Sequence, residues 1–397
     1  MTSPEQIVRL AAQGDGVTAN GRHVAGAVPG DAMIGDAMVA GPHRNNPPCR
    51  HFGRCGGCQL QHVDDETLSH FVSDRVVNAA RKQGFAADTV LPAHLSPPRT
   101  RQRAVLHASA AGQRAVIGFK EAGSHRIVDM RECHILLPEL FAVVDPLRNL
   151  VQRLAGRVAA DITLAASDQG VDCLIKGLPL EGLTALEEIV AFARHQRLAR
   201  LSIDQGWGPE PVWEPEPVTV SFAGFRVTMP AGAFLQATPD GEQVLQADVA
   251  QFIGDAGRVA DLFAGLGTLS VPLAARGRLV TAYEADHAAH LSCRSALSRL
   301  GDSRAVHRDL FRNPLQPAEL RAFDAVILDP PRAGAKAQVE QLAASGVPRI
   351  AYVSCNPASW ARDARLLLYG GYRLDRVRPV GQFRWSTHVE LTSLFVR

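Results

Sequence analysis

The stretch RIAYVSCNP, residues 349–357, combines a strand-like run with a cysteine at its end. Residues 350–353 are apolar and rich in β-formers, which is typical of a buried strand. The Asn-Pro pair after Cys355 ends this strand, and a helical pattern follows over residues 358–368. We therefore predict that Cys355 lies at the carboxyl end of a strand, where open α/β sheets bind their ligands. A single cysteine in such a place is more often buried and inert.

Two more polar motifs follow predicted strands. LDPPR occupies residues 328–332, and DLFAGLGT occupies residues 261–268. From Val218 onward, strand-like and helix-like segments alternate, and this alternation predicts a parallel sheet with helices on both faces. Three polar motifs at one edge of such a sheet indicate an active site. The predicted strands are residues 259–263, 279–284, 305–307, 325–328 and 350–353.

The chain has 397 residues, which is long for a single core and predicts two or three domains. We expect a small N-terminal β-barrel over residues 1–44, a central domain over 45–217 and the α/β domain over 218–397. No apolar run approaches the roughly 18 residues of a membrane span, and no signal pattern opens the chain, so we expect a cytoplasmic protein. The net charge of +2 alone does not indicate a nucleic-acid partner.

Three cysteines lie within ten residues, Cys49, Cys55 and Cys58, in a C-x5-C-x2-C pattern beside glycines. In a reducing compartment, such a group binds metal more often than it forms disulfides. Cys133 is the best candidate for a fourth ligand. Four thiolates suit either a 4Fe–4S cluster or zinc, and zinc could instead recruit His51 or His62. The spacing alone slightly favours zinc.

Arg99, Arg101 and Arg103 alternate along a segment that precedes a predicted strand over residues 104–108. Alternate residues of an extended segment share one face, so these side chains could bind the phosphates of a nucleic acid. A solvated strand edge explains the same pattern equally well. Two helices are also predicted before residue 218, at residues 64–85 and 183–198.

The glycines of DLFAGLGT, including Gly265, would let a ligand approach the backbone closely. Glu284 ends the next predicted strand, where a carboxylate can accept hydrogen bonds from a ribose. Nicotinamide, flavin and S-adenosylmethionine all fit this arrangement. Ser270 replaces the third glycine of the dinucleotide pattern, which disfavours a pyrophosphate. Asp309, after the third strand, would lie near the adenine of a bound cofactor.

Cys355, Asp329 and Glu390 together suggest one reaction in particular. Carbon 5 of uracil is a poor nucleophile, but attack of a thiolate on carbon 6 makes an enolate that can accept a methyl group at carbon 5. A base must then remove the carbon-5 proton so that the cysteine can leave. Glu390 lies at the start of an apolar strand, where a carboxylate is costly unless it is paired or functional. Asp329 could orient the uracil ring.

Taken together, these motifs resemble the RNA (uracil-5-)-methyltransferase family, in the iron–sulfur branch that acts on 23S ribosomal RNA. The N-terminal segment is similar to a TRAM domain, an OB-like RNA-binding barrel. The motifs that match are C-x5-C-G-x-C-x2-Q-H, F-x-Q, D-L-F-x-G-x-G-T, L-D-P-P-R-A-G, V-S-C-N-P and H-x-E, in this order along nearly the whole chain. One departure is Thr238, where the family often has Asn.

The resemblance implies a class I S-adenosylmethionine-dependent methyltransferase fold and 5-methyluridine formation in RNA, with Cys355 as nucleophile and Glu390 as base. It also implies a monomer and a 4Fe–4S cluster rather than zinc. Ribosomal RNA is the expected partner, transfer RNA stays open, and no membrane is involved. The competing interpretations are an iron–sulfur oxidoreductase with flavin or nicotinamide, and a non-catalytic RNA-binding module. The expected pocket residues are Gln236, Phe263, Gly265, Thr268, Glu284, Asp309 and Asp329, and the expected cluster ligands are Cys49, Cys55, Cys58 and Cys133.

Overall fold

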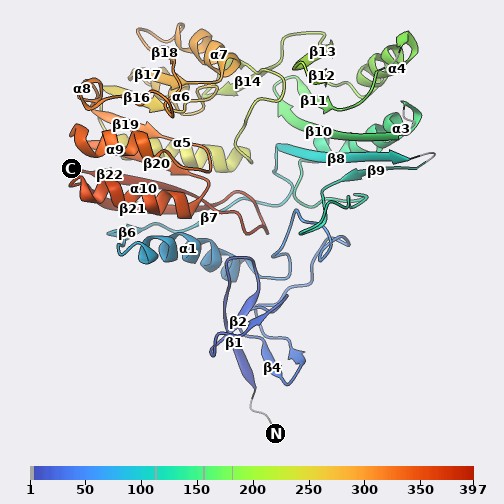
Figure 1. The fold of residues 1–397 in the computed structure, drawn as a ribbon, viewed down its shortest axis with the longest axis horizontal. Coiled ribbons are helices and arrows are strands. Elements are labelled where there is room, and N and C mark those ends of the chain that lie inside the picture. Colours follow the sequence, from blue (N-terminus) through green and yellow to red (C-terminus); the bar gives the residue numbers. More distant parts are fainter. Residues whose placement is uncertain (1–3, 112–113, 155–156, 181) are drawn as a thin grey trace.

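The computed structural model describes residues 4–111, 114–154, 157–180 and 182–397, and the protein has three lobes (Figure 1). The N-terminal lobe is an antiparallel sheet in the order β3-β2-β1-β4-β5 around a small core of Ile7, Ala27 and Met33. The sequence predicted β structure here, and a closed barrel stays a prediction. The strands are β1 Glu5–Leu10, β2 Gly16–Thr18, β3 His23–Val24, β4 Ala32–Ile34 and β5 Ala37–Val39.

The central lobe is a six-stranded sheet in the order β13-β12-β11-β10-β8-β9, drawn in teal and green in Figure 1. Its helices α3 and α4 pack on β9 and β13 and bury a separate apolar core. The strands are β8 Arg103–Ala111, β9 Arg114–Gly118, β10 Arg157–Ser167, β11 Gly170–Lys176, β12 Arg200–Asp204 and β13 Pro209–Trp213. The helices are α2 Pro138–Ala142, α3 Val144–Leu154 and α4 Gly182–His195.

The C-terminal lobe contains a nine-stranded sheet in the order β18-β17-β16-β19-β20-β22-β21-β6, with β7 paired to β21. Strands β16 to β20 are mutually parallel, and β22 is antiparallel to both of its neighbours. Counted from β16, the order is 3-2-1-4-5-7-6, which confirms the predicted parallel sheet. The strands are β16 Arg258–Leu262, β17 Leu279–Glu284, β18 Arg304–His307, β19 Ala325–Leu328, β20 Arg349–Ser354, β21 Arg373–Gly381 and β22 Glu390–Val396.

Strand β20 shows how helices cover both faces of this sheet. Successive side chains of a strand point to opposite faces. Ile350 and Tyr352 enter the core that α1, α9 and α10 share, whereas Ala351 and Val353 enter the core shared with α5 and α6. The run is apolar throughout because both faces are buried. The helices are α1 Asp65–Lys82, α5 Pro239–Ile253, α6 Ser270–Ala275, α7 His287–Leu297, α8 Pro317–Leu320, α9 Lys336–Ser345 and α10 Pro357–Tyr369.

Residues 65–95 belong to the C-terminal sheet, although the sequence suggested a central domain that begins at residue 45. Helix α1 packs on α10 and β21. Strands β6 (Thr89–Val90) and β7 (His94–Leu95) extend the sheet by parallel pairing with β21. Residues 65–95 therefore depart from the predicted central domain, whereas the preceding loop does contact it, since Cys55 forms a β-bridge with Glu121.

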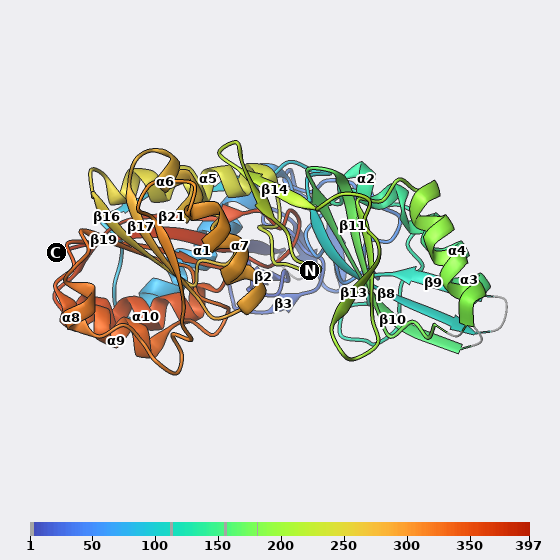
Figure 2. The ribbon, with the colours of Figure 1, turned by 90° about the horizontal axis from the view of Figure 1, so that it is seen from above.

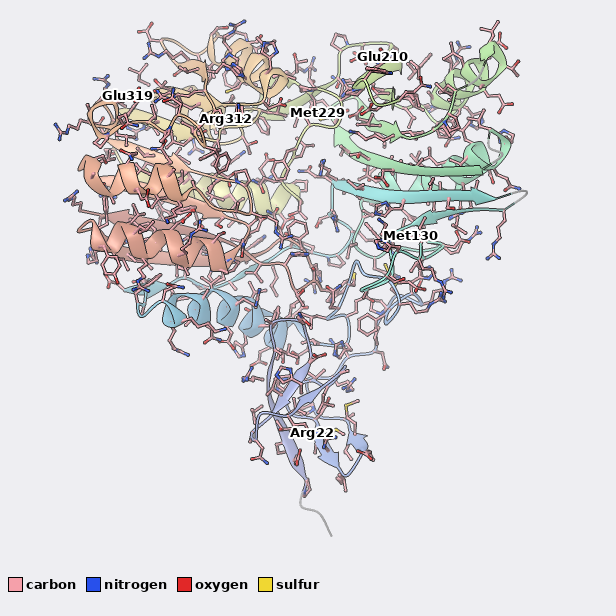
Figure 3. The ribbon with its side chains drawn as sticks, in the orientation of Figure 1. Arg22, Met130, Glu210, Met229, Arg312 and Glu319 are labelled. Atoms are coloured by element: carbon pink, nitrogen blue, oxygen red, sulfur yellow. The ribbon has the colours of Figure 1, made fainter. Side chains whose placement is uncertain are left out.

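Seen from above, the two large sheets lie at opposite ends of the molecule, with β14 between them (Figure 2). The hairpin of β14 (Thr219–Phe222) and β15 (Phe225–Thr228) links the lobes. Met229 follows this hairpin, is fully buried and lies between the lobes in Figure 3. Among the described residues, no helix is both long enough and apolar enough to cross a membrane.

Candidate active site

Cys355 occupies the turn between β20 and α10, as the sequence predicted. Asn356 is the N-cap of α10, and its side chain accepts a hydrogen bond from the main-chain N–H of Ala358 at 3.1 Å. Pro357 fits the first turn because its missing N–H would have no helical partner there. The Asn-Pro pair therefore ends the strand and begins the helix, and it leaves the Cys355 thiol half-buried between them.

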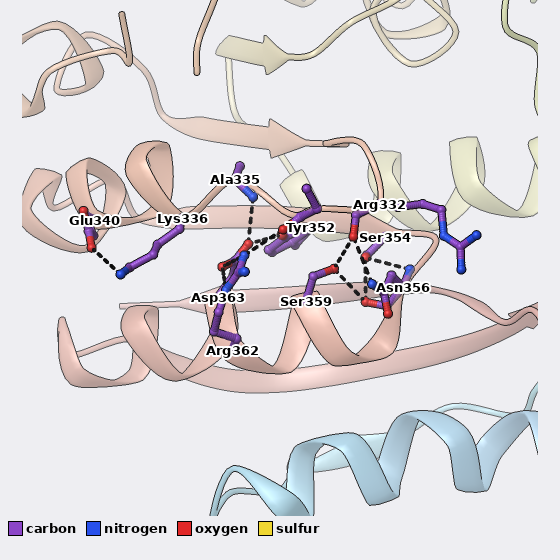
Figure 4. Close-up of polar contacts among 11 residues, drawn as sticks. Arg332, Ala335, Lys336, Glu340, Tyr352, Ser354, Asn356, Ser359, Arg362 and Asp363 are labelled. Carbon is purple, nitrogen blue, oxygen red and sulfur yellow. Dashed lines mark hydrogen bonds and ion pairs between the residues drawn. The ribbon is translucent and has the colours of Figure 1, made fainter. Parts of the chain in front are cut away.

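The loop after β19, which begins with Asp329, is tied to the start of α10 (Figure 4). The carbonyl oxygen of Arg332 accepts hydrogen bonds from Asn356 Nδ2 at 2.9 Å and from Ser359 Oγ at 3.0 Å. Further along the loop, Asp363 Oδ2 accepts the main-chain N–H of Ala335 at 2.8 Å. These bonds fix the loop of Asp329 relative to the turn of Cys355.

A cleft of about 950 Å³ opens at the carboxyl edge of the parallel strands. The face of the central sheet closes its other side with Arg200, Ser202, Pro209 and Pro211. The volume is in the range of small-molecule sites. Eight of the nine residues proposed from the sequence for catalysis and cofactor binding line this cleft: Gln236, Phe263, Gly265, Thr268, Glu284, Asp329, Cys355 and Glu390.

Asp309 is the ninth proposed residue, and it does not line the cleft. Its carboxylate accepts the main-chain N–H of Phe311 at 2.9 Å and forms an ion pair with Arg312 at 3.4 Å. Both contacts are local to the turn after β18. The aromatic ring of Phe311 instead faces Phe263, with ring centroids 5.2 Å apart. A contact of Asp309 with the cofactor stays a prediction.

The acidic groups beside Cys355 all have raised pKa values. Burial raises the pKa of Asp329 to about 7, and burial together with the charge of Asp329 raises the pKa of Glu390 to about 8. Burial and the charges of Glu390 and Asp329 raise the pKa of the Cys355 thiol to about 11. Each anion opposes the others in this poorly solvated place. A bound cation would therefore favour ionisation of all three groups.

The glycine-rich loop after β16 is held by Glu284. Its Oε2 accepts the N–H of Gly265 at 2.8 Å, and its Oε1 accepts the N–H groups of Ala285 and Asp286 at 2.8 and 2.7 Å. Phe263 adopts φ +64°, which is unusual for a side chain of its size. Such strain is often found at binding sites. A carboxylate has more acceptor positions than these three bonds use, so Glu284 can still bind a ribose hydroxyl.

Ser270 has a structural role that its sequence position did not reveal. It stands where a dinucleotide-binding loop would have its third glycine, and its hydroxyl donates a hydrogen bond of 2.5 Å to Asp261 Oδ2. Asp261 is fully buried at the end of β16, and burial raises its pKa to about 7. The serine thus stabilises a buried acid that lines the cleft.

Gln382 is a site residue that the sequence reasoning missed. Its amide nitrogen donates to Gln236 Oε1 at 2.9 Å and to Glu390 Oε2. Its amide oxygen accepts the main-chain N–H groups of Ala237 and Thr238 at 3.0 and 3.3 Å. The sequence feature that could have revealed it is its location eight residues before Glu390, in the segment that leads into the predicted strand of Glu390. Thr238 is the N-cap of α5 and accepts the Gly241 N–H at 3.1 Å.

The three arginines of residues 99–103 have different environments. Arg101 and Arg103 are half-buried, and the Arg101 guanidinium lies 5.6 and 5.4 Å from the ring centroids of Phe119 and Phe383. Burial lowers the pKa of both arginines. The interpretation as a solvated edge is therefore wrong for these two. Arg99 is exposed, and phosphate binding by the group stays a prediction.

The four proposed cluster ligands, Cys49, Cys55, Cys58 and Cys133, line one small cavity and form no disulfide. Burial raises the pKa of Cys58 to about 12. Of the two histidines considered as zinc ligands, only His51 lines this cavity. Within the described part of the chain, however, no group of three or more His, Cys, Asp or Glu side chains is arranged to hold a metal ion. The donor set fits a four-thiolate site in number and chemistry, but its present geometry is not such a site.

Two family models match the C-terminal lobe. Residues 300–397 match the tRNA (Uracil-5-)-methyltransferase model, and residues 224–346 match the Methyltransferase small domain. Among solved structures, the tRNA (uracil-54, C5)-methyltransferase of Pyrococcus abyssi, in complex with S-adenosyl-L-homocysteine, has a TM-score of 0.75. The match covers 99% of this chain and 100% of that chain at 20% identity. It shows that the two proteins share the fold over their whole length.

Curated relatives match along the whole chain as well. An RNA methyltransferase of Zymomonas mobilis is 47% identical over 99% of this chain and 100% of its own length. The 23S rRNA (uracil(1939)-C(5))-methyltransferase RlmD of Nitrosospira multiformis is 33% identical over 100% of this chain and 98% of its own length. With its C-terminal family model and these full-length relatives, the chain belongs to the RNA (uracil-5-)-methyltransferase family.

Proposed function

We propose that this enzyme methylates carbon 5 of a uridine in 23S ribosomal RNA through a covalent adduct between Cys355 and carbon 6. Its family supports the coarser activity, RNA uracil-C5 methylation with S-adenosylmethionine as methyl donor. One observation supports the mechanism above all. A thiol, two carboxyl groups of raised pKa and an amide converge in one cleft from four separate segments, as Cys355, Asp329, Glu390 and Gln236.

The first step is attack of the Cys355 thiolate on carbon 6 of the uracil. A carbon–sulfur bond forms, and the electrons of the carbon 5–carbon 6 double bond move toward the carbonyl at carbon 4. The thiol must first release its proton to solvent, and Arg332 favours this ionisation while Glu390 and Asp329 oppose it. A donor at the carbonyl oxygen would stabilise the enolate, and Gln236 is placed at the cleft wall to provide one.

S-adenosylmethionine, when bound, supplies a methyl cation equivalent to carbon 5. The residues at its proposed site are the strained loop of Phe263 and Gly265, the carboxylate of Glu284 and Thr268. The cleft fits a cationic ligand because its acidic groups are buried and mutually repulsive. A sulfonium there would reduce that repulsion.

The last step belongs to Glu390. After methylation, carbon 5 holds both the methyl group and its original proton. The Glu390 carboxylate takes this proton, the carbon 5–carbon 6 double bond forms again, and the carbon–sulfur bond breaks to release Cys355. A base with a pKa of about 8 is well matched to this transfer near neutral pH. The target nucleotide must leave its stack to enter so deep a cleft, which fits a loop or a flipped base.

We further propose that Cys49, Cys55, Cys58 and Cys133 hold a 4Fe–4S cluster, supported by their common cavity and free thiols. The cluster would shape the RNA-binding part of the chain and take no part in methyl transfer. The segment directly after Cys58 is joined to the loop that precedes Glu390. There, the main-chain N–H groups of Gln59 and Leu60 both donate to the carbonyl oxygen of Trp385. The TRAM-like barrel and the monomeric state are proposed on the same family resemblance.

Nucleoside mass spectrometry of RNA from a deletion strain tests the proposed function. We expect 5-methyluridine to disappear from one position of 23S ribosomal RNA and to return with the wild-type chain but not with Cys355→Ala. The alternative substrate is transfer RNA. Loss of 5-methyluridine from transfer RNA alone would replace the ribosomal target, and no change in either RNA would exclude the activity.

A further inference from the structure

Gln382 is almost completely buried, with 1% of its surface exposed, directly after β21. All of its side-chain hydrogen bonds go to two segments of the site. One segment contains Gln236, and the other contains Glu390. A buried amide with partners at both ends has a defined orientation.

The orientation of this amide follows from its main-chain partners. The N–H groups of Ala237 and Thr238 can only donate, so the end of Gln382 that faces them must be the oxygen. The opposite end is then the NH₂ group, which donates to Gln236 Oε1 at 2.9 Å. No alternative assignment of the two atoms satisfies these bonds.

The orientation of Gln236 follows in turn. Its oxygen faces Gln382, so its NH₂ group is the end left for a ligand. Gln236 lines the cleft, and within the described part of the chain no hydrogen bond engages its amide nitrogen. The residue therefore offers donors to the cleft, which fit a carbonyl oxygen and repel an amino group.

The second hydrogen of the Gln382 NH₂ group is directed to Glu390 Oε2. A donor stabilises the ionised carboxylate, while burial and Asp329 act against ionisation. Gln382 thus favours the ionised form of the proposed base, which Asp329 opposes. One side chain serves two groups that act at different steps.

We propose that Gln382 is a positioning residue that holds Gln236 with its NH₂ group toward the substrate carbonyl and at the same time holds the carboxylate of Glu390. This inference rests on the proposed function, because it assigns the two groups to the attack on uracil and to the removal of the proton. It predicts that loss of Gln382 slows both the attack on carbon 6 and the removal of the carbon-5 proton. A defect in Glu390 alone slows only the removal of the proton.

The first experiment follows attack and methylation without the removal of the proton. In ribosomal RNA transcribed in vitro with 5-fluorouridine, fluorine replaces the hydrogen at carbon 5. With S-adenosylmethionine present, the methylated adduct therefore has no proton for a base to remove, and it accumulates. We expect Gln382→Met to form this adduct at least about tenfold more slowly than wild type, which is the loss of roughly one hydrogen bond. Glu390→Gln should form it at close to the wild-type rate.

The matched control is Gln102→Met. The Gln102 amide donates at 3.1 Å to the main-chain oxygen of Gln236, and among the described residues no hydrogen bond joins it to the Gln236 side chain. This variant removes an amide hydrogen bond from the same loop without changing the orientation of the Gln236 side chain. Its adduct rate should stay close to wild type, which separates the orientation of Gln236 from general loosening of the loop.

The second experiment is the pH profile of turnover on uridine-containing RNA. Without the donor to Glu390, ionisation of the base becomes harder. The acid limb of the profile for Gln382→Met should therefore shift upward by about one pH unit. Gln102→Met should retain the wild-type pH dependence, since a purely structural defect lowers the turnover rate at every pH without shifting the acid limb.

Thermal unfolding and S-adenosylmethionine affinity show whether Gln382→Met is folded. Gln236→Met is a second variant, which removes the amide toward the cleft and leaves the donor from Gln382 to Glu390 in place. It should slow adduct formation without shifting the acid limb of the pH profile. A folded Gln382→Met with the wild-type adduct rate and pH profile overturns the inference. If the wild-type chain itself forms neither adduct nor 5-methyluridine, the proposed function fails instead.

Discussion

The phenolic oxygen of Tyr352 lies 2.8 Å from Asp363 Oδ2, and both side chains are completely buried. Tyr352 belongs to β20 and Asp363 to α10, so this bond joins the two elements that flank Cys355. The same carboxylate oxygen accepts the N–H of Ala335, which follows the loop of Asp329 (Figure 4). Gly334 is required beside it, because a Cβ there would lie 2.4 Å from Asp363 Oδ2.

We predict that Tyr352→Phe lowers the free energy of unfolding by about 1–2 kcal/mol, because a buried carboxylate loses one of its donors. Urea denaturation measures this change. Tyr369→Phe is the matched control, since Tyr369 is 73% exposed and its hydroxyl accepts a hydrogen bond from Arg365 at 2.9 Å. The two variants should differ clearly. Equal stabilities would mean that the Tyr352 hydroxyl contributes nothing to the link between β20 and α10.

We predict that Glu390→Gln accumulates a methylated RNA still joined to Cys355. Glutamine keeps the size of the side chain and removes the basic carboxylate, so attack and methylation proceed while proton removal stops. A denaturing gel with S-adenosylmethionine labelled in its methyl group should show a slow, labelled band. The band should be absent from the Cys355→Ala, Glu390→Gln double variant. Turnover of Glu390→Gln at the wild-type rate would assign the base to another residue.

We predict that Glu390→Gln also changes how stability depends on pH. The pKa of Glu390 is raised from 4.5 in the unfolded chain to about 8 in the fold, so its stabilising contribution is complete below the lower value and is lost as the pH rises through the upper one. Relative to wild type, the variant should therefore gain stability between about pH 5 and about pH 9, by more than about 1 kcal/mol. Denaturant titrations at both pH values, without cofactor, measure the gain. A constant difference would mean that Glu390 ionises normally.

We predict that Arg99 and Arg101 respond differently to replacement by alanine. Arg99 is exposed, so Arg99→Ala should weaken RNA binding and reduce the slope of log affinity against log salt by about one. Arg101 is packed against two aromatic rings, so Arg101→Ala should lower the melting temperature. S-adenosylmethionine affinity should not change in Arg99→Ala. An unchanged salt slope would exclude a phosphate contact at Arg99.

We predict that protein purified without oxygen is brown, with broad absorption near about 400 nm, and contains iron and sulfide. Cys58→Ser and Cys133→Ser should each abolish iron binding, because either variant has only three of the four proposed thiolate ligands. Cys173→Ala is the control, since Cys173 is buried in the core of the central lobe and does not line the cavity that the proposed cluster ligands share. Stoichiometric zinc without iron would instead support the zinc alternative.

The parts of the site that follow from the sequence are the local ones. The apolar run of β20 and the Asn-Pro pair determine where Cys355 lies, because both signals act within a few residues. Glu284 could likewise be assigned from its place at the end of β17. The sequence order of the strands then brings these residues to one edge of the sheet.

The parts that do not follow depend on contacts between distant segments. The bond from Gln382 to Gln236 spans 146 positions, and an isolated glutamine gives no sign of such a partner. The amphipathic pattern of α1 predicted a helix but not its neighbours, α10 and β21, near the other end of the chain. Arg101 looked like a surface residue because its aromatic partners, Phe119 and Phe383, come from two different lobes.

The pairing of β6 with β21 sets an order of events during synthesis. Residues 218–397 cannot complete the C-terminal sheet by themselves. Elements β6, β7 and α1 also belong to it, and they are made first and must wait for β21 and α10. Until the ribosome has released those last segments, the apolar side of α1, with Phe71, Val72 and Val76, lacks the cover it has in the finished protein. A fragment that begins at residue 218 would have the opposite defect, an open sheet edge at β21 and a bare face on α10. Residues 65–95 thus pack against the last quarter of the chain only after that quarter has been made. We therefore expect the enzyme to fold as a whole rather than lobe by lobe.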